Sequence, residues 1–138
     1  MTEIIPGLLW IGNAGQVRDL STVLDAGIEA LVDLAWEESP ARVTRDVIYC
    51  RFPLLDGAGN PPNRLRIAID TVVSLLEKRT PTLVFCGAGM SRSPAVAAAA
   101  LALSRRDNLD ETLNGVVAGR PHDVSPALWE EIKAVCGA

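Results

Sequence analysis

Residues 82–95 read TLVFCGAGMSRSPA, and the rest of the fold can be inferred outward from this stretch. A short apolar run, Leu83 to Phe85, ends in Cys86, passes through small residues and enters an alanine-rich segment at Arg92. This order predicts a strand, a tight loop and a helix, an arrangement that binds anions at the helix N-terminus.

The spacing within this stretch suits a phosphate ligand, because five residues separate Cys86 from Arg92. If the backbone N–H groups of the loop point inward, they form a nest for a phosphate dianion, with two of its oxygens held by Arg92. The same field favours the thiolate of Cys86, and the Ser93 hydroxyl is placed to donate to the sulfur. The predicted phosphate-binding residues are Gly87, Ala88, Gly89, Met90, Ser91 and Arg92.

The pattern Cys86-x-x-Gly89-x-x-Arg92-Ser93 resembles the signature loop of the cysteine-dependent protein phosphatases, most closely their small dual-specificity branch. The family has a histidine where this chain has Phe85, and that histidine orients the loop and helps to ionise the thiol. A buried cysteine that ends a core strand is the structural alternative. The resemblance implies a cysteine nucleophile that needs neither cofactor nor metal.

A second candidate for a catalytic residue lies in the Gly/Pro-rich loop of residues 53–62. Cleavage of a phosphate ester requires a proton for the departing oxygen, and a positioned carboxylic acid supplies it. Asp56 is the candidate acid, since its surroundings resemble the family's acid loop; Asp46 and Asp123 are weaker alternatives. The alternative for Asp56 is a carboxylate that stabilises an Asp-Gly turn.

Alternating strand and helix patterns predict one α/β domain over residues 1–138, with a central, mostly parallel sheet of about five strands flanked by helices. Apolar runs predict strands at 3–12 (a hairpin), 28–34, 47–52 and 83–86. Helical periodicity predicts helices at 17–26, 60–78 (capped by Asn60), 92–103 and 108–119, and a last helix that is capped by Ser125. Asp33 is interpreted as structural. Trp36 is interpreted as an aromatic that anchors the 36–45 loop; the alternative, which the resemblance implies, is that it lines the active site, because the equivalent stretch can edge that site in the family.

Composition limits the remaining function classes. The net charge of −4 and the absence of a Lys/Arg block argue against nucleic acid and anionic membranes as partners. Three cysteines without paired spacing favour a reducing compartment, and we expect a cytoplasmic protein without a leader or a membrane span. A single histidine argues against a structural zinc site.

The leading hypothesis is a phosphomonoester hydrolase of the dual-specificity type, which works through a cysteinyl-phosphate on Cys86. Arg92, Asp56 and Ser93 complete its catalytic set, and the substrate is a phosphorylated protein or a small phosphomonoester. A phosphate-binding module without turnover, favoured by Phe85, is the alternative. Sulfur transfer or arsenate reduction ranks last, because the candidate acid precedes the loop. The sequence does not indicate the oligomeric state.

Overall fold

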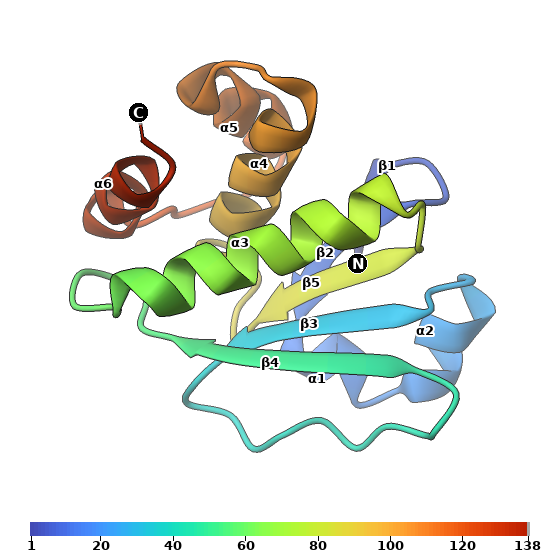
Figure 1. Ribbon diagram of the computed structural model, residues 1–138. Helices are drawn as coiled ribbons and strands as arrows, with labels where there is room; N and C mark the ends of the chain where they lie inside the picture. The colour runs from blue at the N-terminus through green and yellow to red at the C-terminus, as the bar shows by residue number, and fades with distance from the viewer. Residues whose placement is uncertain (138) are drawn as a thin grey trace.

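The computed structural model describes residues 1–137, and a five-stranded sheet lies at its centre (Figure 1). The strands follow the order β1-β2-β5-β3-β4, and only the β1–β2 pair is antiparallel. Their bounds are β1 Thr2–Ile5, β2 Leu9–Asn13, β3 Ala30–Ala35, β4 Ile48–Leu54 and β5 Thr82–Cys86. The predicted α/β class and the mostly parallel sheet are therefore confirmed.

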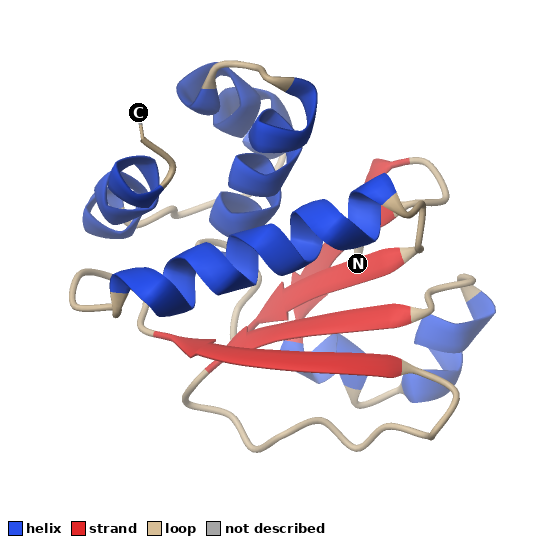
Figure 2. Ribbon diagram, in the orientation of Figure 1, coloured by secondary structure: helices blue, strands red, loops and turns tan. Residues whose placement is uncertain are grey.

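Helices cover both faces of this sheet (Figure 2). Four helices pack on one face, namely α3 (Pro62–Glu77), α4 (Arg92–Arg105), α5 (Leu109–Val117) and α6 (Pro126–Val135). Two short helices, α1 (Ala14–Val17) and α2 (Leu20–Asp25), lie on the other face. Because the four parallel strands run the same way, the loops that follow β5, β3 and β4 all emerge at one edge of the sheet.

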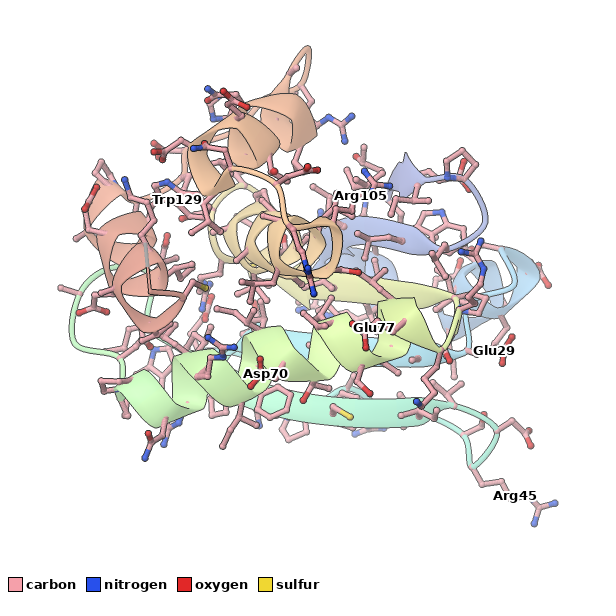
Figure 3. The ribbon with its side chains drawn as sticks, turned by 45° about the horizontal axis from the view of Figure 1, so that its top comes forward. Glu29, Arg45, Asp70, Glu77, Arg105 and Trp129 are labelled. Atoms are coloured by element: carbon pink, nitrogen blue, oxygen red, sulfur yellow. The ribbon has the colours of Figure 1, made fainter. Side chains whose placement is uncertain are left out.

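Helix α4 is the buried centre of the four-helix layer. Every residue from Arg92 to Ala102 is buried, as its all-round apolar sequence predicts. Its alanines allow close approach to the sheet and to α3, α5 and α6. Trp129 lies between α6 and α5 (Figure 3), and its Nε1 donates to Asp110 Oδ1 at 2.8 Å. This packing fixes the N-terminus of α4 against the end of β5.

Side chains alternate along β5 between the two faces of the sheet. Val84 and Cys86 join the core on the α4 side, whereas Leu83 and Phe85 join the smaller core beneath α1 and α2. Cys86 therefore points toward the start of α4, and Phe85 points away from it.

The predicted helix at 17–26 is instead two short helices that are interrupted at Arg18 and Asp19. The Asp19 carboxylate accepts hydrogen bonds from the hydroxyls of Ser21 and Thr22, and this local turn competes with continuous helix. Within residues 1–137, no helix combines the length and apolar character needed to cross a membrane.

Candidate active site

The sulfur of Cys86 lies at the carboxyl end of β5, where the loop turns back over it. Cys86 is only 2% exposed, and the Gly89 N–H donates to its Sγ at 3.3 Å. Ser93 Oγ, in the first turn of α4, lies 3.4 Å from Sγ and 3.5 Å from the carbonyl oxygen of Gly12. The loop and the first turn of α4 thus place two polar groups, the Gly89 N–H and the Ser93 hydroxyl, in contact with the sulfur.

Gly89 makes this curvature possible, because its φ of +77° lies in the left-handed region. A Cβ at this position would lie 2.9 Å from the carbonyl oxygen of Gly12, at the end of β2. The same two segments are joined by a hydrogen bond from the Ala14 N–H to the Gly87 carbonyl, at 3.4 Å. The loop therefore packs directly on β2, with no space for a side chain at position 89.

Arg92 is buried, and its guanidinium is held by backbone carbonyls near the ends of β3 and β4 and by Glu37 in the loop after β3. The β3 carbonyl is that of Leu34, which accepts from Nη1 at 3.4 Å. The same nitrogen donates to the carbonyl oxygen of Leu54, at the end of β4, at 2.9 Å. Arg92 Nη1 and Nη2 also donate to the two carboxylate oxygens of Glu37, both at 2.6 Å. Glu37 follows β3, and no motif in the sequence indicated its role. The bidentate pair fixes the plane of the guanidinium.

A count of N–H groups shows which edge of Arg92 remains for a ligand. A guanidinium has five N–H groups, and Glu37 and Leu54 accept three of them. Nε is buried and has no hydrogen-bond partner within residues 1–137. The Nε–H and the second Nη2 hydrogen form the other bidentate edge of the group, which suits two oxygens of one phosphate.

The charges of this pair stabilise each other. Hydrogen bonding to Arg92 lowers the pKa of Glu37, while hydrogen bonding to Glu37 raises the pKa of Arg92. Gly87 lies under the carboxylate, and a Cβ at position 87 would collide with Glu37 Oε2. A side chain at position 87 would therefore displace the Glu37 carboxylate from its present position.

The loop that carries Glu37 is held by residues of β3 and β4. Asp33 accepts a hydrogen bond from the Tyr49 hydroxyl at 2.5 Å, and that hydroxyl accepts the Ala41 N–H at 2.9 Å. Arg51 Nη2 donates to the carbonyl oxygens of Ala35 and Glu38. The structural interpretation of Asp33 is thus confirmed, because its carboxylate supports the 36–47 loop.

Asp56 is joined directly to the loop after Cys86. Ser91 Oγ donates to Asp56 Oδ1 at 2.5 Å and accepts the Ser125 N–H at 2.9 Å. Because the Ser91 hydroxyl is used in this way, it makes no capping hydrogen bond at the N-terminus of α4. The candidate acid is therefore held beside an N-terminus of α4 that remains open to an anion.

Asn60 was expected to cap α3, and this prediction is wrong. The N-cap residue is Pro61, and Asn60 is buried inside the acid loop. Its Oδ1 accepts the Leu55 N–H at 2.7 Å, and its Nδ2 donates to the carbonyl oxygens of Leu55 and Gly57. The side-chain amide of Asn60 forms hydrogen bonds with three backbone groups of this tight loop. These three bonds stabilise the protein more than one capping bond at the start of α3 would. Asn60 consequently shapes the loop on either side of Asp56.

A small cavity of about 130 Å³ collects these groups. Its lining residues are Asp56, Cys86, Ala88, Met90, Ser91, Arg92 and Asp123. Asp123 thus lies at the cavity, whereas Asp46 does not: its neighbour Arg45 lies at the end of the molecule where β4 begins (Figure 3). Within residues 1–137, no group of three or more His, Cys, Asp or Glu side chains is arranged to hold a metal ion.

Known proteins that are similar to this chain include the dual specificity phosphatases. The chain is 30% identical over 129 residues to the dual specificity protein phosphatase Mpk3 of Drosophila melanogaster, which covers 90% of this chain. It spans only 30% of the length of that protein. No protein-family model matches the chain.

Solved structures share the fold over nearly the whole chain. A mouse putative dual specificity phosphatase complexed with zinc tungstate is 26% identical, with a TM-score of 0.83 over 98% of this chain and 85% of its own. Human DUSP28 is 22% identical, with a TM-score of 0.84 over 99% and 96% of the two chains. The chain is thus similar to the small dual-specificity phosphatases in sequence and fold, and the predicted resemblance is confirmed.

Proposed function

We propose that this protein is a cysteine-dependent phosphomonoester hydrolase. The Cys86 thiolate attacks phosphorus, the ester P–O bond breaks, and Asp56 gives its proton to the departing oxygen. Water then attacks the cysteinyl-phosphate, Asp56 takes a proton from that water, and the sulfur leaves as a thiolate with a hydrogen bond from Ser93. Arg92 and the loop N–H groups stabilise the charge on the phosphoryl oxygens throughout.

The observation that carries this proposal is the joint position of three groups at one cavity. Cys86 supplies a sulfur and Asp56 supplies a carboxyl group. Arg92 supplies a bidentate edge whose Nε has no partner among the described residues 1–137. A nucleophile, an anion receptor and an acid are the parts that a phosphoryl transfer needs. The similarity to dual specificity phosphatases supports the same reaction class.

The test is hydrolysis of p-nitrophenyl phosphate by the purified chain. Cys86→Ser removes the nucleophile and is expected to abolish turnover. Asp56→Asn removes the proton donor and is expected to lower kcat by about 10²- to 10⁴-fold with a substrate whose leaving group needs the proton. Asp46→Asn is the matched control, because Asp46 lies away from the cavity. Full activity of the Cys86→Ser protein would contradict the proposal.

A phosphate-binding module without turnover is the second candidate, and Phe85 is the observation that favours it. Phe85 is buried in the core under α1 and α2 and offers no hydrogen bond to the loop. Retention of Cys86, Asp56 and Ser93 argues against this candidate, since a binder needs only Arg92 and the loop N–H groups. Vanadate binding by calorimetry, without turnover between pH 5 and pH 8, would favour it.

A further inference from the structure

The 36–47 loop joins two neighbouring parallel strands, β3 and β4, without a helix. Such strands are usually connected by a crossover helix that covers a face of the sheet, but residues 36–47 form neither helix nor strand. Ala41 and Val43 pack on the smaller core beneath α1 and α2, so the loop lies on that side of the sheet (Figure 1). In the described residues, this face is therefore covered by two short helices and a loop.

The one aromatic side chain of the loop does not fill the space beneath it. Trp36 is 59% exposed, so its interpretation as a loop anchor is wrong, and it does not line the 130 Å³ cavity. The loop is held instead by polar contacts. The Tyr49 hydroxyl accepts the Ala41 N–H, and Arg51 donates to the carbonyl oxygen of Glu38. These contacts fix the backbone of the loop without filling the space under it.

A second cavity, of about 420 Å³, lies between α1 and the loop. Its apolar lining comes from α1, the loop and β5, through Ala14, Val17, Pro40, Ala41 and Phe85. It shares no lining residue with the cavity at Cys86. Because Phe85 and Cys86 point to opposite faces of the sheet, the two cavities lie on opposite sides of β5. The larger cavity has the size and the apolar lining of a site for a small organic molecule.

The polar side chains of this second cavity leave one positive charge without a partner. Arg18, the residue after α1, pairs with Glu38 at 3.6 Å, so these two charges offset each other. Arg42 is exposed at the cavity and makes no ion pair within residues 1–137. The whole chain has a net charge of −4, so the cavity differs in sign from the rest of the molecule. A ligand with one negative charge complements it.

Each side of the second cavity is joined to a group of the candidate active site. Phe85 directly precedes the candidate nucleophile. The Ala14 N–H donates to the carbonyl oxygen of Gly87 at 3.4 Å. Glu38 directly follows Glu37, the residue that fixes the guanidinium of the site. A ligand held between α1 and the loop therefore also orders the phosphate-binding groups, and groups ordered in advance bind phosphate more tightly.

We propose that the second cavity is an effector site for a small apolar carboxylate, which increases the affinity of the active site for phosphate. The apolar body fills the space between α1 and the loop, and the carboxylate pairs with Arg42. The carboxylate site itself does not depend on the proposed function, whereas its effect on phosphate binding rests on it.

The binding test compares 2-naphthoate with its neutral isostere 2-naphthamide by calorimetry. The acid is expected to bind about tenfold more tightly, because only the carboxylate pairs with Arg42. Arg42→Ala is expected to remove this preference. Arg45→Ala is the matched control and is expected to keep it, since Arg45 is exposed in the same loop but does not line the cavity. Equal affinities of the wild-type protein for the acid and the amide would overturn the proposal.

A second variant blocks the cavity itself. Ala41→Phe places a ring beneath the loop and is expected to abolish 2-naphthoate binding, while the far-ultraviolet circular dichroism of the variant stays that of the wild-type protein. Undiminished binding of 2-naphthoate by this folded variant would overturn the assignment to this cavity.

Vanadate separates the two cavities, because it mimics phosphate at the active site. 2-Naphthoate is expected to bind in the presence of vanadate and to raise the vanadate affinity about fivefold. By linkage, vanadate raises the 2-naphthoate affinity by the same factor. Displacement of 2-naphthoate by vanadate would place the acid in the active site and overturn the proposal. Binding of both ligands without any change in either affinity would overturn the effector role.

Failure of the proposed function gives a different result. Absence of vanadate binding and of p-nitrophenyl phosphate hydrolysis would overturn the proposed function and the effector role, while 2-naphthoate binding that depends on Arg42 would still support the carboxylate site. Absence of 2-naphthoate binding in a protein that hydrolyses p-nitrophenyl phosphate would overturn the carboxylate site alone.

Discussion

At the scale of the residue, Arg92 is the group on which phosphate binding depends. One bidentate edge of its guanidinium is occupied by Glu37. The other bidentate edge contains Nε, which has no hydrogen-bond partner in the part of the chain that the structure describes. Glu37 therefore acts as a positioning residue that fixes the plane of Arg92 before a ligand arrives. A receptor fixed in advance does not have to be ordered during binding, which improves affinity.

Replacing Glu37 tests this role. Glu37→Ala leaves Arg92 free to rotate, so we expect kcat/KM for p-nitrophenyl phosphate to fall about 10- to 100-fold, mainly through KM. Glu37→Gln keeps an acceptor oxygen and is expected to restore part of the loss. Glu38→Ala is the control, since its side chain pairs only with exposed Arg18 at 3.6 Å. An increase in kcat/KM would show that Glu37 competes with phosphate instead.

At the scale of the element, two loops beyond the signature stretch position the catalytic groups. The 36–47 loop is anchored through Tyr49, and the acid loop is anchored through Asn60. Each of these two anchoring residues gives a prediction that can be checked without an activity assay.

Tyr49 is the only tyrosine in the chain, so its ionisation can be followed by ultraviolet absorbance. Burial, together with the hydrogen bond to Asp33, raises the pKa of Tyr49 to about 12. Because the folded state holds this proton more tightly than the unfolded state, the stabilisation is complete below pH 10 and is lost as the pH rises toward 12. A titration midpoint near 10 in the folded protein would contradict this account of the loop.

Asn60→Ala is expected to lower the free energy of unfolding by about 1–3 kcal/mol, because the acid loop loses its internal hydrogen bonds. It is also expected to slow hydrolysis of alkyl phosphates more than of p-nitrophenyl phosphate, since Asp56 is displaced. Asn108→Ala removes the N-cap of α5 and is the control. The free energy of unfolding of the Asn108→Ala variant is expected to fall by about 1 kcal/mol. The ratio of its rates with alkyl phosphates and with p-nitrophenyl phosphate is expected to stay unchanged. Identical leaving-group dependence in both variants would contradict the role of Asn60.

The sequence predicted features whose interacting partners lie close together in the chain. Cys86, Gly89 and Ser93 contact one another within eight residues, so their spacing alone indicated the loop. The Ser125 cap of α6 was predicted for the same reason. The roles of Glu37 and Asn60 were not predicted, because one depends on a partner 55 residues away and the other on backbone groups of an irregular loop.

At the scale of the whole molecule, the parallel sheet explains why distant residues meet. The strands β5, β3 and β4 end at the same edge, so the loops with Cys86, Glu37 and Asp56 converge there. Open α/β sheets bind ligands at this edge. The apolar runs indicated where the strands lie, but not which strands pair. The pairing of β3 with β4 and β5 depends on long-range packing, including that of α3 and α4 on these strands, which a local pattern does not reveal.

The most direct test of the central claim is detection of phosphate on Cys86 during turnover. Ser93→Ala is expected to slow cleavage of the cysteinyl-phosphate, so that a rapid-quench reaction with p-nitrophenyl phosphate shows a burst of about one product per protein molecule. Mass spectrometry of the quenched protein is then expected to locate one phosphoryl group on the peptide that contains Cys86. Turnover with no phosphoryl group on Cys86, or with the group on another residue, would contradict the account.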